Sequence, residues 1–143
     1  VLHAVAQKYN DFLEKFIRAT PRRWNINAAE LWIELKMVKL ALASIGDGKY
    51  ITDFTDNDSA RSAATSGYSM RPLMSPIASE LDTLVGNSSA GLRTLRVTTK
   101  ENTIADALSR GDIQPLTALA SELDITIIWH SIEEWEWDDI VTL

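Results

Sequence analysis

Three acidic residues stand where their carboxylates could reach a common metal ion. Glu30 falls in the first turn of a predicted helix, Asp56 follows a predicted strand, and Asp106 lies on a later short helix. Clustered carboxylates repel one another unless cations neutralise them, so such a cluster indicates divalent metal. Two hard cations about 3.5–4 Å apart can hydrolyse a phosphodiester, because they activate water and stabilise the leaving oxygen. The three acids therefore make metal-dependent phosphodiester hydrolysis our first hypothesis.

Composition limits the other kinds of chemistry. The chain has no cysteine, which excludes disulfides and thiolate metal sites and fits a reducing compartment. We therefore expect an intracellular protein, in the cytoplasm or nucleus, that is not secreted. The two histidines, His3 and His130, are far apart in the sequence and have no nearby ligands, so we expect structural roles for them. The net charge of -6 argues against tight nucleic-acid binding by this chain alone, whereas a cation site must be acidic.

Helices and strands are predicted to alternate around the acids. Apolar residues at three- and four-residue spacing predict helices over 2–19 and 27–45, and β-branched and aromatic residues predict a strand over 49–55. This alternation continues to the C-terminus and indicates an α/β domain with few strands for a fully covered sheet. No apolar run approaches the roughly 20 residues that span a bilayer, so we expect no membrane segment. The further predictions are helices over 58–65, 72–85, 101–110 and 113–123, and strands over 92–98 and 125–129.

Three segments resemble the ribonuclease H domain that follows reverse transcriptase in retroelements, in the form found in tyrosine-recombinase (DIRS-like) retrotransposons. Residues 24–31 read Trp-Asn-Ile-Asn-Ala-Ala-Glu-Leu, residues 51–57 read Ile-Thr-Asp-Phe-Thr-Asp-Asn, and residues 104–110 read Ile-Ala-Asp-Ala-Leu-Ser-Arg. In that family a helical Glu-Leu pair, a strand ending in Thr-Asp-Asn and an Ala-Asp-Ala-Leu-Ser-Arg helix carry metal ligands. The resemblance implies that Glu30, Asp56 and Asp106 are catalytic metal ligands.

The resemblance also implies a fold and partners. We expect a ribonuclease H-like mixed sheet flanked by helices, with two Mg²⁺ (or Mn²⁺) ions in the complete domain. The implied substrate is the RNA strand of an RNA–DNA hybrid, and the implied partner is the reverse transcriptase domain of the same polyprotein. We divide the chain into an N-terminal helical segment (1–23), a ribonuclease H-like core (24–112) and a C-terminal helix with a Trp-rich acidic extension (113–143). Candidate contacts to nucleic acid are Asn57, Arg93, Arg96 and Lys100.

The sequence departs from the family at two points. The family's first catalytic Asp lies on a first strand upstream of the helix Glu, but the acids upstream of Glu30 are Asp11 and Glu14, both in a helix-like segment. Arg96 stands about where the family often has a His. Since the chain begins at Val1 rather than Met, we expect an interior piece of a polyprotein. Its first strands would be missing or replaced by the N-terminal helix, and the piece alone would be inactive.

Simpler interpretations remain open for each acid. Glu30 could stabilise the positive end of its helix, Asp56 could cap the next helix, and Asp106 could be a solvated helix residue. Asp53 is an alternative to Asp56 on the same strand, although the two residues differ in parity and face opposite sides. Two other functions also remain open: a degenerate, non-catalytic ribonuclease H-like module of a reverse transcriptase, and an unrelated α/β protein-interaction domain.

Overall fold

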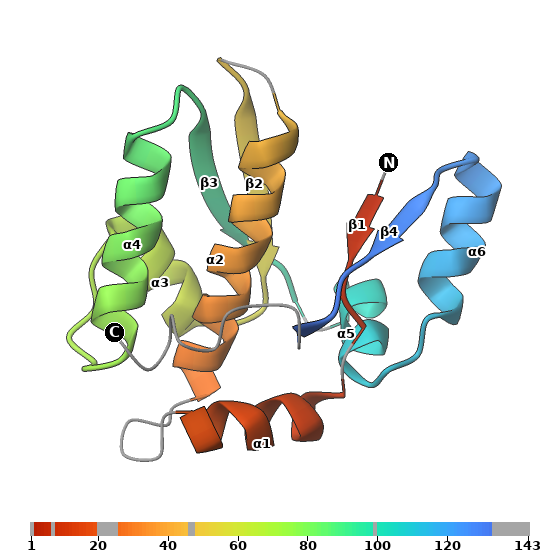
Figure 1. Cartoon of the computed structure of the whole chain (residues 1–143), viewed down its shortest axis with the longest axis horizontal. Coiled ribbons are helices and arrows are strands. Elements are labelled where there is room, and N and C mark those ends of the chain that lie inside the picture. Colours follow the sequence, from red (N-terminus) through yellow and green to blue (C-terminus); the bar gives the residue numbers. More distant parts are fainter. Residues whose placement is uncertain (1, 7, 20–25, 46–47, 99, 133–143) are drawn as a thin grey trace. The chain divides into compact units, whose positions relative to one another are not determined.

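The structure is a computed structural model that describes residues 2–6, 8–19, 26–45, 48–98 and 100–132 (Figure 1). The chain forms two compact units. The terminal unit combines Val1–Thr20 with Thr98–Thr142, and the central unit is Pro21–Val97. The described residues form six helices and two parallel two-stranded sheets, so the expectation of a mixed α/β chain is confirmed.

The central unit is built around a parallel pair of strands. β2 (Tyr50–Thr55) pairs with β3 (Gly91–Arg96), with Tyr50 opposite Gly91 and Thr55 opposite Arg96. Parallel neighbours need a long crossover, and α3 (Asp58–Ser66) and α4 (Met74–Gly86) provide it. A Cβ atom at Gly91 would lie 2.4 Å from Cε1 of Tyr50, so a larger residue would collide with the tyrosine ring. A side chain at position 91 would therefore displace the exposed Tyr50 ring from the place it has over Gly91.

The long helix α2 (Ile26–Ser44) forms the core of the central unit together with α4. Figure 1 shows these two helices side by side along the β2–β3 pair. α2 is apolar on most of its circumference, as expected for a helix that is covered on several sides. The apolar residues of both helices that are at least 98% buried are Ala28, Ala29, Leu31, Trp32, Leu35, Met74, Ile77, Ala78 and Leu81.

β2 has one covered and one open face. Tyr50 and Phe54 are 82% and 58% exposed, whereas the alternate residues Ile51, Asp53 and Thr55 are half-buried. Side chains alternate across a strand, so Asp53 points toward the covered side. An acid on the covered side of a strand needs a polar partner there.

The terminal unit contains the second parallel pair. β1 (Leu2–Ala4) pairs with β4 (Ile127–Trp129), and Nδ1 of His3 lies 2.9 Å from Nε2 of His130, at hydrogen-bond distance. The expected structural role of the two histidines therefore has a contact to support it. The helices of this unit are α1 (Tyr9–Ala19), α5 (Thr103–Ser109) and α6 (Gln114–Leu123).

The prediction of one helix over 2–19 is wrong at its start. Residues 2–4 are a strand, and the helix begins at Tyr9. The backbone of Leu2 donates to the carbonyl of Thr126 at 2.8 Å, and the backbone of His130 donates to that of Ala4 at 2.8 Å. These partners lie more than a hundred residues away, so local apolar spacing could not reveal them. The segment 1–23 is therefore not purely helical.

The other predicted elements are confirmed, with boundaries within two residues of those expected. Most of the Trp-rich acidic extension, residues 133–143, lies outside the described residues, so its role stays a prediction. Among the described residues, no helix has the length and apolar character needed to cross a membrane. The division at residues 23 and 112 also stays a prediction.

We predict that Leu35→Ala lowers the free energy of unfolding by about 2–5 kcal/mol, because Leu35 is 1% exposed and its loss leaves a cavity. Urea unfolding of the full chain measures the change. Leu123→Ala is the matched control, since Leu123 is 56% exposed and its truncation should change stability by about 0.5 kcal/mol or less. Equal losses in the two variants would contradict the placement of the core.

Candidate functional site

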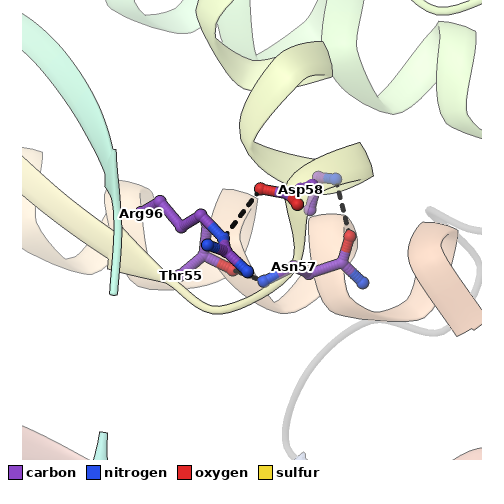
Figure 2. Close-up of polar contacts among 5 residues, drawn as sticks. Thr55, Asn57, Asp58 and Arg96 are labelled. Atoms are coloured by element: carbon purple, nitrogen blue, oxygen red, sulfur yellow. Dashed lines mark hydrogen bonds and ion pairs between the residues drawn. The ribbon is translucent and has the colours of Figure 1, made fainter. Parts of the chain in front are cut away.

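Asn57 lies where β2 passes into α3, and it caps that helix. Its Oδ1 accepts a hydrogen bond from the backbone nitrogen of Ala60 at 2.8 Å, and its own backbone nitrogen donates to Oγ1 of Thr55 at 3.2 Å (Figure 2). Its φ and ψ of -97° and 109° are extended, as usual for a residue that precedes a helix. These contacts hold Asp56, between Thr55 and Asn57, at a turn of defined shape.

The amide nitrogen of the same side chain reaches α2. Nδ2 of Asn57 donates to Oε2 of Glu30 at 2.5 Å and to Oδ1 of Asn27 at 2.9 Å. A single amide thereby joins the N-terminal part of α2 to the start of α3. Glu30 thus contacts the residue that directly follows Asp56.

Glu30 and Asp56 carry carboxylate oxygens, which are the ligands that magnesium prefers. Glu30 is half-buried and Asp56 is exposed, so the junction combines a held carboxylate with a solvent-accessible one. Mg²⁺ commonly binds one or two carboxylates and fills its remaining positions with water and phosphate oxygens. The two residues fit such a site in type and number. In the described part of either unit, however, no three acidic or histidine side chains form a group that could hold a metal ion.

Asp106 belongs to the terminal unit and already has a cationic partner. It lies in α5, and its Oδ2 accepts a hydrogen bond from Nη1 of Arg110, one helical turn later. The Arg110 side chain is 66% exposed, so solvent screens this pair and limits its worth to about 1 kcal/mol or less. Asp106 is therefore held by a weak ion pair with the next turn of its own segment.

The candidate nucleic-acid contacts differ in their surroundings. Arg96 forms an ion pair with Asp58, with Nε 2.9 Å from Oδ1, so part of its charge is balanced at the start of α3 (Figure 2). Arg93 is exposed on β3 and lines a shallow hollow of about 300 Å³ with Arg61 and Asp82. Lys100 is exposed in the terminal unit. Arg93 and Lys100 thus lie where a phosphate could approach them.

One polar cluster was missed in the sequence. Glu34 of α2 is 7% exposed, and its Oε1 accepts a hydrogen bond from Oγ1 of Thr94 at 3.3 Å. Burial, reinforced by Asp53, raises the pKa of Glu34 to about 10, and the Thr94 hydrogen bond opposes this shift. The available signal was an acid inside the apolar stretch Leu-Trp-Ile-Glu-Leu, combined with the inward parity of Asp53.

No family model, curated protein or solved structure matches this chain. The assignment of a function therefore depends on the residues and contacts described above.

We predict that Asn57→Asp destabilises the chain at pH 7, even though Asp and Asn cap helices equally well. The new carboxylate can still accept from Ala60, but it presents an acceptor to Glu30 and Asn27 where the amide donates. Asn57→Ala loses both the cap of α3 and the amide hydrogen bonds to α2. It should lower the free energy of unfolding, measured in urea, by about 1–3 kcal/mol.

The matched control is Asn102→Asp, at the N-cap of α5, where the side chain makes no capping hydrogen bond. A negative charge at that helix start should leave stability unchanged or raise it slightly. If Asn57→Asp proved as stable as the original chain, the amide link to Glu30 would be disproved.

Proposed function

We propose that this chain carries part of the ribonuclease H-like domain of a retroelement polyprotein, which hydrolyses the RNA strand of RNA–DNA hybrids. The observation that carries the proposal is the 2.5 Å contact between Nδ2 of Asn57 and Oε2 of Glu30. It joins a helix acid to the end of the strand that Asp56 follows. The resemblance requires these two acids to act together at such a junction.

The proposed roles follow from these contacts. Glu30, Asp56 and Asp106 are the metal ligands, and two Mg²⁺ (or Mn²⁺) ions, when bound, supply the activated water and stabilise the leaving oxygen. Asn57 holds the Glu30 carboxylate in one orientation through its amide. The Asn57 cap and the Thr55 contact fix the backbone on both sides of Asp56.

The proposed site needs one more carboxylate. Before Glu30 the sequence has two acids, Asp11 and Glu14, and both lie in α1 rather than on a strand. In the family the first Asp is a further metal ligand, and neither α1 residue is assigned that role. We therefore expect residues 1–143 alone to be inactive and the activity to require a carboxylate from further upstream in the polyprotein.

A non-catalytic module of a reverse transcriptase is the second candidate. It is favoured by protein partners of the acids, such as Asn57 for Glu30 and Arg110 for Asp106. Acids satisfied in this way can serve packing and substrate placement without metal. The two candidates differ in whether the acids bind divalent cations.

We predict that a chain extended upstream of Val1 cleaves the RNA strand of a hybrid in Mg²⁺. Asp56→Asn should lower the rate by about 100-fold or more, since even residues that only orient metal ligands are worth about 10–100-fold. Glu122→Gln, which changes an exposed acid on α6, is the matched control and should cleave normally. An extended protein that leaves the hybrid intact would exclude the enzyme.

Titration calorimetry with Mn²⁺ distinguishes the catalytic domain from the module. The catalytic domain should bind Mn²⁺, and the binding should disappear in both Asp56→Asn and Asp106→Asn. Absence of binding to the extended protein would favour the module.

A further inference from the structure

The buried carboxyl groups of Glu34 and Asp53 present a problem that the proposed function does not explain. Oε2 of Glu34 and Oδ2 of Asp53 are both buried and lack a hydrogen-bond partner if both groups are ionised carboxylates. Ionised carboxylates can only accept hydrogen bonds, so two of them cannot satisfy each other. Burying both charges without a donor would cost far more than a typical contact contributes.

The strand register places the two acids and a hydroxyl on one side of the sheet. Asp53 of β2 is opposite Thr94 of β3, and Thr94 donates to Glu34 of α2. The cluster therefore lies between α2 and the two strands. It contains two carboxyl groups and one hydroxyl, and Thr94 already donates its proton to Glu34.

We propose that Glu34 and Asp53 form an acid pair that holds one proton at neutral pH, and that this proton is part of the contact between α2 and β2. The protonated Oε2 of Glu34 donates to Oδ2 of Asp53, which satisfies both buried oxygens with one hydrogen bond. The pair then carries a single negative charge instead of two.

The charged side chains on the neighbouring helices have other partners or are exposed to solvent. On α2, Lys36 lies over the Trp32 ring at 5.4 Å from its centroid, and Lys39 pairs with Glu80 of α4 at 3.0 Å. On α3, Asp58 pairs with Arg96, and the remaining charged residues of α3 and α4, Arg61 and Asp82, are exposed. Burial acts first and Asp53 second to raise the pKa of Glu34, and Asp53 supplies the charge interaction.

The pair gives the central unit an unusual dependence on pH. The pKa of Glu34 rises from 4.5 to about 10 on folding, so the folded chain binds more protons between these values. The stabilisation is therefore complete below about pH 4.5 and is lost as the pH rises toward 10. A salt-bridged carboxylate behaves in the opposite way, because its stabilisation is lost in acid.

The direct test is a ¹³C NMR titration of the side-chain carboxyl carbons in the full chain. At pH 7 we expect the Glu34 carbon to have the chemical shift of a protonated acid, and to move to that of a carboxylate only in alkali. A Glu34 carbon that is already ionised at pH 7 would overturn the proposal. If Mg²⁺ then also raised the melting temperature at pH 7, a bound cation rather than a shared proton would neutralise the two carboxylates.

Glu34→Gln tests the effect on stability. Its amide can donate to Asp53 and accept from Thr94 without a titrating proton, so its melting temperature should be the same at pH 6 and pH 9. The original chain should lose about 4 °C or more over this range. Glu80→Gln, an equal change at a half-exposed position of α4, should behave like the original chain. A Glu34→Gln variant that melts with the original pH dependence would refute the acid pair and leave the proposed nuclease untouched.

Discussion

The hydrogen bonds of the Asn57 side chain hold the central unit together at the point where function is proposed. Its oxygen caps α3, and its amide nitrogen donates to Asn27 and Glu30 near the N-terminus of α2. A hydrogen bond to a charged group contributes about 1.5–3 kcal/mol, and a partner left unsatisfied costs a similar amount. The apolar core places α2, and this one amide group links its N-terminal part to the turn between β2 and α3. The position of Asp56, between Thr55 and Asn57, follows from these contacts.

The proposed acid pair is a second polar contact between α2 and the β2 region, next to that of Asn57. Glu30 and Glu34 are four residues apart on α2, so they share one face of that helix. Glu30 contacts Asn57 just beyond β2, and Glu34 faces Asp53 within β2. The chain numbers decrease along the strand as they increase along the helix, so the polar face of α2 runs antiparallel to β2. Each glutamate meets a group that can donate to it or share its proton, which lets an apolar helix carry two acids toward a sheet.

Much of the secondary structure could be predicted from the sequence because its signals are local. Glycines and the spacing of apolar residues located β2, β3 and five of the helices, including the position of Asp56 at the end of a strand. The strand at residues 2–4 could not be predicted, since its partner is β4, near the other end of the chain. The Glu34–Asp53 pair was missed for a related reason: each residue gives a local signal, but only the packing of α2 on β2 shows that the two acids meet.

The three predicted acids have different surroundings. Glu30 accepts a hydrogen bond from Asn57, the residue that follows Asp56, and the metal-ligand roles of Glu30 and Asp56 stay a prediction. Asp106 lies in the terminal unit with Arg110 as its partner, and its meeting with the other two acids stays a prediction. Local sequence patterns carry no information about how separate units dock. The expectation that Asp106 meets Glu30 and Asp56 therefore rests on the resemblance alone.

Paramagnetic broadening by Mn²⁺ in the NMR spectrum of the full chain tests that convergence most directly. Broadening falls off steeply with distance from the ion, so residues that share a metal site lose their signals together. We expect the signals of Glu30, Asp56 and Asp106 to disappear at the same low Mn²⁺ concentration, before those of other exposed acids such as Asp82. Broadening confined to one unit, with the signals of the other unchanged, would contradict the shared site and with it the proposed nuclease.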